Sequence, residues 1–322
     1  MVRKGADERH HYGPAAGLGY AWVVSQRAGN DRDGLAAALA GVRGLLLDMD
    51  GVIVRAGEAI PGAADALREL ERRGFPYRIV TNTSLLSTAS LAGSAAALGM
   101  AIPAERFVSA LAAAALDTAR RHPGEPLYVL ASADARTEFV GQRLLTHEEA
   151  DAPGARAAAV VVGDAPEEAT WANLNRAFRL VRRGAELVAM HRNRWWLTPA
   201  GETLDSGAYV AGLEYAAGVR ARVTGKPSPL FFRTVAREVA REASTTVNGR
   251  VTRHELAVVG DDVETDVLAG MRAGMRGILV LTGKHGPADA EAAARRRHGA
   301  RPDAIAHSLA DVVGALDSGP TT

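Results

Sequence analysis

The fold class of this chain is decided by one stretch, Gly44-Leu45-Leu46-Leu47-Asp48-Met49-Asp50-Gly51. Its apolar half is short and uninterrupted, which is typical of a strand buried on both faces of a parallel sheet. Its polar half places the carboxylates of Asp48 and Asp50 where that strand should end. Gly51 then permits a sharp turn. We therefore expect a ligand-binding edge directly after Leu47.

Two later segments repeat this arrangement. The apolar runs 221–224 and 256–259 are followed by Gly225-Lys226-Pro227 and by Gly260-Asp261-Asp262, with Asp266 close behind. Read as strands of one open parallel sheet, all three runs bring their carboxyl ends to a single crevice, where such sheets bind ligands. So many carboxylates with one ammonium would be costly unpaired, so we expect a bound divalent cation.

The rest of the chain alternates strand-like and helix-like segments, which predicts an α/β fold. A clear break at His122-Pro123-Gly124-Glu125-Pro126 precedes a second α/β series, and the Lys226 segment then returns to the first. The predicted fold is a Rossmann-like parallel-sheet core with an inserted α/β cap domain. Its predicted parts are a poorly ordered N-terminal extension (1–40, with a short helix at 35–39), the first core part (41–122), the cap (123–219), the second core part (220–317) and a tail (318–322).

Composition excludes several classes of function. The chain has 322 residues, 47% of them hydrophobic, which supports sizeable cores. A formal charge of +1 argues against a nucleic-acid surface, and the basic run 295–298 is interpreted as a solvated helix end. The absence of cysteine excludes disulfides and thiolate chemistry. No apolar stretch approaches the roughly 18 residues of a membrane span, and no signal pattern begins the chain. A cytoplasmic protein without a membrane partner is expected.

The strand-end residues suit phosphoryl chemistry. A carboxylate such as Asp48 can attack phosphorus to form an aspartyl-phosphate while a second residue protonates the leaving oxygen. Thr81 and Asn82, after the strand 77–80, offer a hydroxyl and an amide to phosphate oxygens, and Lys226 offers a positive charge. Each signal alone also has a structural interpretation: a surface turn, a helix cap, a solvated lysine, or acidic complements to a helix dipole.

Together, the order and strand-end placement of these segments resemble the four motifs of the haloacid dehalogenase superfamily of aspartate-nucleophile phosphatases. A cap between the second and third motifs resembles the NagD-like subclass IIA, whose cap is of the C2 type. The segments Val162-Gly163-Asp164, 173–178 and 213–216 are similar to the branch that contains phospholysine phosphohistidine inorganic pyrophosphate phosphatase. The resemblance covers about residues 42–316.

This resemblance implies a role for each matching residue. Asp48 is the expected nucleophile and a metal ligand, and Asp50 the expected general acid/base and a ligand through its carbonyl. Thr81, Asn82 and Lys226 are expected to hold the phosphoryl group. Asp261 is the remaining metal ligand, with Asp262 and Asp266 steadying the metal's waters or Lys226. The implied cofactor is Mg²⁺, which favours few carboxylates, phosphate oxygens and retained waters.

The resemblance also implies that the loop 192–203 reaches over the active site and reads the leaving group. Its candidate residues are Arg192, Asn193, Arg194, Trp195 and Trp196. The alternative is that both indoles pack in the cap core beside Tyr209. Trp171 is expected in the cap core, on one helix face with Leu174 and Phe178.

The predicted function is a Mg²⁺-dependent phosphatase that hydrolyses a small phosphorylated metabolite through an aspartyl-phosphate. Phosphoramidate or pyrophosphate hydrolysis, and a non-catalytic phosphate-binding module on the same fold, are the alternatives. A homodimer formed through the cap is also predicted.

Overall fold

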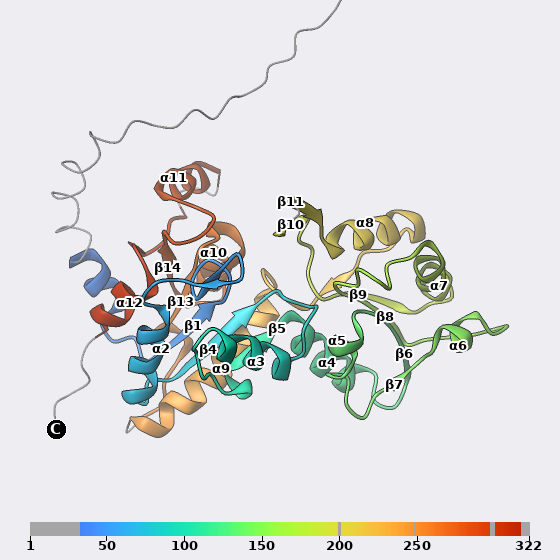
Figure 1. The fold of residues 1–322 in the computed structure, drawn as a ribbon, viewed down its shortest axis with the longest axis horizontal. Coiled ribbons are helices and arrows are strands. Elements are labelled where there is room, and N and C mark those ends of the chain that lie inside the picture. Colours follow the sequence, from blue (N-terminus) through green and yellow to red (C-terminus); the bar gives the residue numbers. More distant parts are fainter. Residues whose placement is uncertain (1–32, 199–200, 248, 297–299, 317–322) are drawn as a thin grey trace, which may run out of the picture.

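The structure is a computed structural model, and it describes residues 33–198, 201–247, 249–296 and 300–316. The chain forms two separate parallel sheets with helices on both faces of each (Figure 1). One is the six-stranded core sheet, and the other is the five-stranded sheet of the cap. The predicted fold class, a Rossmann-like core with an inserted α/β cap, is confirmed.

The core sheet has the order β15-β14-β13-β1-β4-β5. Neighbouring strands are parallel throughout. Their side chains alternate between two apolar layers: Leu45 and Leu47 face one, and Leu46 faces the other. The strands are β1 (Gly44–Asp48), β4 (Tyr77–Thr81), β5 (Phe107–Ser109), β13 (Leu256–Gly260), β14 (Arg276–Val280) and β15 (Ala304–Ala306).

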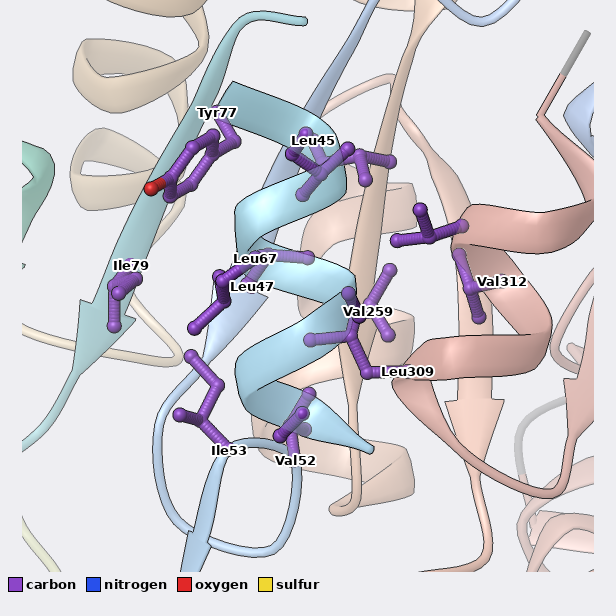
Figure 2. Close-up of a cluster of buried hydrophobic side chains, with 14 of the residues drawn as sticks. Leu45, Leu47, Val52, Ile53, Leu67, Tyr77, Ile79, Val259, Leu309 and Val312 are labelled. Carbon is purple, nitrogen blue, oxygen red and sulfur yellow. The ribbon is translucent and has the colours of Figure 1, made fainter. Parts of the chain in front are cut away.

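Helices cover both faces of the core sheet. Figure 2 shows the layer under α2 and α12, where Leu67 and Val312 meet Leu45, Leu47 and Val259 of the sheet. Apolar side chains of α9 pack in the layer on the opposite face of the sheet. This helix begins with Pro229, and the first position of a helix tolerates proline. The core elements outside the sheet are β2 (Val54–Arg55), β3 (Glu58–Ala59), α2 (Ala63–Arg72), α3 (Thr88–Ala97), the 3₁₀ helices η1 (Ala104–Arg106) and η2 (Arg253–Glu255), α9 (Pro229–Thr246), the π-helix η3 (Val263–Val267), α10 (Leu268–Arg272), α11 (Pro287–Arg296) and α12 (Leu309–Ala315).

The cap sheet has the order β12-β9-β8-β6-β7. Helices α7 and α8 pack on one face, and α4 packs on the other. A hairpin of β10 and β11 lies between core and cap at the top of Figure 1. The elements are α4 (Ala110–Arg121), β6 (Pro126–Leu130), α5 (Ala133–Arg136), β7 (Arg143–Leu144), α6 (His147–Asp151), β8 (Ala159–Val162), α7 (Trp171–Arg182), β9 (Glu186–Ala189), β10 (Trp195–Thr198), β11 (Gly201–Leu204), α8 (Ser206–Ala217) and β12 (Arg222–Val223).

Two local expectations were wrong. The run 221–224 was expected to be a core strand, but β12 pairs in parallel with β9 of the cap. The segment 192–203 was expected to be a loop, but most of it forms the antiparallel hairpin β10–β11. Both errors arise because a short apolar run does not specify its pairing partner, which only the assembled sheet provides.

Trp171 was also placed wrongly, since it is 81% exposed. It is the first residue of α7, directly after the capping residue Thr170. Leu174 and Phe178 pack against the cap core as expected. The helical period was therefore correct, but Trp171 lies on the side of the first turn that the described residues leave exposed, whereas Asn173 in the same turn is buried.

The domain boundaries stay a prediction. Because α4 and β12 both pack with the cap sheet, we propose an insert somewhat wider than 123–219. Residues 33–39 are helical and bury Leu35 and Leu39 in the core, so this part of the expected extension is ordered. Residues 1–32, 297–298 and the tail 318–322 lie outside the described residues. Within the described part, every helix is too short or too polar to cross a membrane.

Candidate active site

Asp48 and Lys226 meet at the carboxyl edge of the core sheet. Asp48 is the last residue of β1, and its Oδ1 accepts hydrogen bonds from Lys226 Nζ (2.6 Å) and from the main-chain N–H of Met49 (2.7 Å). Within the described residues, no hydrogen bond reaches the other carboxylate oxygen, Oδ2. One oxygen of this buried carboxylate is thus held, and the other is left for a ligand.

Lys226 reaches this edge from the cap, since it follows β12. Its Nζ lies between two carboxylates, 2.6 Å from Asp48 Oδ1 and 2.7 Å from Asp266 Oδ1. Its main chain is held by Asn82, whose Oδ1 accepts from Lys226 N (2.9 Å) and whose Nδ2 donates to Lys226 O (3.0 Å). Lys226 is therefore held both at its main chain and at its ammonium group.

Asp261 follows β13 and is packed tightly between two glycines. A Cβ added at Gly51 or at Gly283 would overlap its side chain, so both positions require glycine. Gly51 also has a φ of 79°, which other residues rarely adopt. The main-chain N–H of Lys284 donates to Asp261 Oδ2 (2.7 Å).

The other two acidic residues of this motif have separate contacts. Asp262 caps η3, because its Oδ1 accepts from the main-chain N–H groups of Glu264 and Thr265, both at 3.0 Å. Its Oδ2 pairs with Lys284 Nζ (2.9 Å). Asp266 is 1% exposed and contacts Lys226. Asp262 therefore orders the loop, whereas Asp266 is part of the buried charge.

Thr81 and Asp50 complete the predicted set. Thr81 ends β4, and its Oγ1 accepts from the main-chain N–H of Thr83 (3.0 Å). Asp50 is exposed and bridges to Val54. The structure thus brings Asp48, Thr81, Lys226, Asp261 and Asp266 to one edge, but it commits the Asn82 amide to the main chain of Lys226.

Buried negative charge dominates this edge. Burial raises the pKa of Asp48 to about 7; Lys226 opposes the rise, and Asp261 and Asp50 add to it. Burial and then the charge of Asp48 raise the pKa of Asp266 to about 7. Burial and Asp266 raise the pKa of Asp261 to about 6. Each carboxylate resists ionisation because burial removes it from water and the nearby positive charge does not offset that loss.

Among the residues that the structure describes, two groups of side chains have the spacing of metal ligands. The first, here called the core cluster, is Asp48, Asp261 and Asp266, whose carboxylate oxygens lie within 4.8 Å of one another. The second, here called the cap cluster, has the same spacing and consists of Asp164, His191 and Asp205, with Ser84 hydrogen-bonded to Asp164. The core cluster offers only oxygen donors, as Mg²⁺ prefers.

The candidate specificity residues separate into different roles. Arg192 pairs with Glu214 inside the cap (2.7 Å), and the Asn193 side chain reaches Asn82 (3.3 Å). Trp195 lines a hollow of about 490 Å³ against α8, together with Arg194, Leu204 and Ala208. Trp196, the next residue of β10, is not among the described residues that line this hollow. Both indoles are about half exposed, at 49% and 47%, and neither is in the cap core.

Sequence reasoning missed Gly283 and Lys284 in this region, and it expected Ser84 to tune the substrate without foreseeing its contact with the cap. Gly283 and Lys284 shape and contact the acidic motif, and Ser84 joins the core to the cap. The first two could have been found, because Gly283-Lys284-His285 follows the apolar run 276–280 at another strand end. Ser84 carried no comparable signal.

Comparison with known proteins agrees with this geometry. A family model for haloacid dehalogenase-like hydrolases matches residues 45–143, and a HAD-hydrolase-like model matches residues 223–312. The chain is 35% identical to human phospholysine phosphohistidine inorganic pyrophosphate phosphatase over 257 residues, 78% of this chain and 87% of that protein.

Solved structures of phosphatases also superpose on this chain. A p-nitrophenyl phosphatase from Archaeoglobus fulgidus has a TM-score of 0.74 at 26% identity, covering 85% of this chain and 99% of that one. NagD from E. coli has a TM-score of 0.69 at 27% identity, covering 84% and 97%. A glycerol phosphate phosphatase from Mycobacterium tuberculosis in complex with magnesium has a TM-score of 0.71 at 27% identity, covering 85% and 77%.

The fold and the site define a class, the haloacid dehalogenase-like phosphatases, which are hydrolases of small phosphorylated substrates. Within it, the chain belongs to the NagD-like subclass IIA.

Proposed function

We propose that this chain is a Mg²⁺-dependent phosphatase that hydrolyses a small phosphorylated metabolite through an aspartyl-phosphate on Asp48. The observation that carries the proposal is the state of the Asp48 carboxylate. One oxygen is held by Lys226 and Met49, and the other accepts no hydrogen bond from the described residues. A carboxylate fixed in this way presents one oxygen to a phosphorus atom at little further entropic cost.

The residues divide the reaction between them. Asp48 Oδ2 attacks phosphorus, the bond to the leaving oxygen breaks, and protonated Asp50 gives that oxygen its proton. Asp50 then takes a proton from the water that attacks the aspartyl-phosphate, so phosphate departs and both carboxyl groups return to their starting states. Lys226 offsets the charge of the phosphoryl oxygens, with the Thr81 hydroxyl beside it. Since the Asn82 amide is engaged, only its main-chain N–H is left for phosphate.

The acidic residues fit a divalent cation. In the part of the chain that the structure describes, three clustered carboxylates share the ammonium of Lys226, and burial raises the pKa values of all three. Asp48 and Asp261 would hold the ion with their side chains, Asp50 with its carbonyl, while Asp262 and Asp266 order the surrounding loop and Lys226. When bound, Mg²⁺ supplies positive charge to the phosphoryl oxygens.

A screen of phosphorylated compounds tests the proposal. Purified protein should release phosphate from p-nitrophenyl phosphate and from at least one small metabolite ester. Chelation should remove this activity and Mg²⁺ should restore it. Full activity in carefully demetallated protein would refute the cation, and binding of phosphate without turnover on any substrate would favour a non-catalytic module.

A second candidate activity is hydrolysis of phosphoramidates or pyrophosphate. It is favoured by the 35% identity to a relative named as a phosphatase of phospholysine, phosphohistidine and pyrophosphate. The same attack by Asp48 would serve these substrates. Including all three compounds in the screen distinguishes the candidates by their relative kcat/KM.

Trp196 is our proposed contact for the leaving group, because it is half exposed and, unlike Trp195, does not line the hollow against α8. Replacing it with alanine should change the ranking of substrates several-fold, since one lost aromatic contact is worth about 1 kcal/mol. Trp195→Ala is the matched control on the same strand. An unchanged ranking in Trp196→Ala, or a larger change in the control, would contradict the assignment.

We further propose that the cap mediates a homodimer. Trp171 and Tyr215, on the packed helices α7 and α8, are 81% and 93% exposed. Light scattering should give twice the chain mass, and Trp171→Glu should reduce it. A monomeric wild-type protein would refute this proposal.

A further inference from the structure

Asn82 joins three segments that are distant in sequence. Its Oδ1 accepts from Lys226 N (2.9 Å), and its Nδ2 donates to Lys226 O (3.0 Å) and to Asn193 Oδ1 (3.3 Å). Both ends of the amide are therefore used: Oδ1 binds the main chain of Lys226, and Nδ2 binds both that main chain and the side chain of Asn193 in the cap. Close packing enforces this arrangement, because a Cβ at Gly225 would lie 2.7 Å from Asn82 Oδ1.

Asn193 is itself held firmly by the cap. Its main-chain N–H donates to His191 Nδ1 (3.3 Å), and its carbonyl accepts from the main-chain N–H of Gly207 (3.0 Å) at the start of α8. An added Cβ at Gly207 would overlap that carbonyl, so the two segments are in direct contact. The Asn193 side chain consequently follows the position of the cap.

The cap cluster makes a second contact between the cap and this segment of the core. His191 Nε2 lies 3.0 Å from Ser84 Oγ and 3.3 Å from Asp164 Oδ2. Ser84 comes two residues after Asn82 in the core, donates to Asp164 Oδ2 (2.8 Å) and accepts from Asp164 N (2.8 Å). The core segment 82–84 therefore touches the cap at both of its ends.

We propose that Asn193 is a positioning residue that acts on Lys226 through Asn82, rather than a residue that reads the leaving group. The cap, through Asn193, orients the Asn82 amide, which in turn sets the main chain of Lys226. The position of the cap is thereby linked to the ammonium beside Asp48. This inference rests on the proposed phosphatase function.

The two roles for Asn193 predict different substrate dependence. A contact with the leaving group would matter for large substrates and little for small ones. A residue that positions Lys226 should matter equally for all, because every substrate presents the same phosphoryl group to the lysine.

Two Asn193 variants separate these roles in the Mg²⁺-loaded enzyme. Asn193→Leu keeps the size but loses the acceptor, so kcat/KM should fall about three- to tenfold, as one net hydrogen bond allows, on p-nitrophenyl phosphate and on the best metabolite alike. Asn193→Asp keeps an acceptor for Asn82 Nδ2 and should recover most of this loss. Asn193→Ala serves the same comparison if the leucine variant does not fold.

A measurement without turnover keeps the inference separable from the proposed function. The main-chain N–H of Lys226 is protected by Asn82, so its hydrogen exchange should be faster in Asn193→Leu and near wild type in Asn193→Asp. Unchanged exchange, a loss confined to one substrate, or no recovery in Asn193→Asp would overturn the inference. A wild-type protein that hydrolyses nothing, but shows the exchange pattern, would refute the function and leave the link intact.

Discussion

The core cluster, with three carboxylates, and the cap cluster, with two carboxylates and an imidazole, share the spacing of metal ligands but differ in electrostatic balance. Each brings three potential ligand atoms within 4.8 Å, largely out of solvent. In the core cluster, burial raises the pKa of Asp48 to about 7 and of Asp261 to about 6, and among the described residues Lys226 is the one cation paired with Asp48 and Asp266. The negative charge there exceeds its local compensation.

The hydrogen-bonding groups and charges of the cap cluster compensate one another. Burial raises the pKa of Asp205 to about 7, whereas burial of Asp164 is outweighed by hydrogen bonds from His191, Asp205 and Ser84, which lower its pKa. One carboxyl group thus holds a proton while its neighbour is ionised and hydrogen-bonded. Ligand spacing alone does not distinguish a cation site from a structural network; uncompensated charge does.

The largest expected effect is on kcat, which should depend on the core cluster and not on the cap cluster. Asp48→Asn should lower kcat by more than about ten-thousandfold, because an amide is a poor nucleophile towards phosphorus. Asp164→Asn is the matched control in the cap cluster, and it should keep kcat within about tenfold of wild type. Steady-state kinetics on p-nitrophenyl phosphate measure both. Comparable losses of kcat in the two variants would contradict the assignment of catalysis to the core cluster alone.

The clusters should also differ in their response to a cation. Saturating Mg²⁺, at about 100 times its Kd, should raise the free energy of unfolding by about 3 kcal/mol, seen as a higher Tm. Asp261→Ala should lose this increment, whereas Asp262→Ala should largely keep it, since Asp262 contacts Lys284 and main-chain N–H groups. Asp164→Asn should keep it fully. An increment that disappears with Asp164 would place the ion in the cap.

Stability without metal should depend on the cap cluster. Ser84→Ala removes the hydroxyl that donates to Asp164 and accepts from its main-chain N–H. Leaving these buried groups unpaired should cost about 1–3 kcal/mol in urea unfolding. Ser94→Ala, at an exposed serine on α3, should stay within about 0.5 kcal/mol of wild type. Equal effects of the two changes would mean that Ser84 contributes no more than a surface hydroxyl.

The smallest expected effect is a pH dependence. Burial raises the pKa of Asp205 from 3.8 to about 7, so the folded state holds this proton more tightly than the unfolded state. The resulting stability is present below about pH 4 and is lost as pH rises towards 7. Between pH 6 and pH 8, wild type should therefore lose about 1 kcal/mol relative to Asp205→Asn, which cannot ionise there. A constant difference across this range would contradict the raised pKa.

Much of the core site was predictable because strand ends in a parallel sheet converge. Asp48, Thr81 and Asp261 each follow an apolar run, and those runs became β1, β4 and β13. Short-range pattern was enough here, since a continuous apolar run and the residue after it determine both a strand and its exposed end.

Other features depended on pairing across the fold. Lys226 reaches Asp48 as predicted, yet the strand before it pairs with β9 of the cap rather than with the core. Asn82 was predicted to bind phosphate, but its amide is occupied by Lys226 and Asn193. Nothing local in the sequence around residue 82 indicates partners 111 and 144 residues away.

By itself, the sequence determined the α/β alternation, the inserted cap and the residue types at each strand end, because these follow from hydrophobic period and from residues adjacent in the chain. The tertiary structure alone decided which carboxylates are left without compensating charge and which are satisfied. It also decided that Ser84, His191 and Asn193 link the cap to Lys226. The physical reason is that burial and electrostatic compensation are properties of neighbours in space, and those neighbours come from segments that meet only when both sheets have formed.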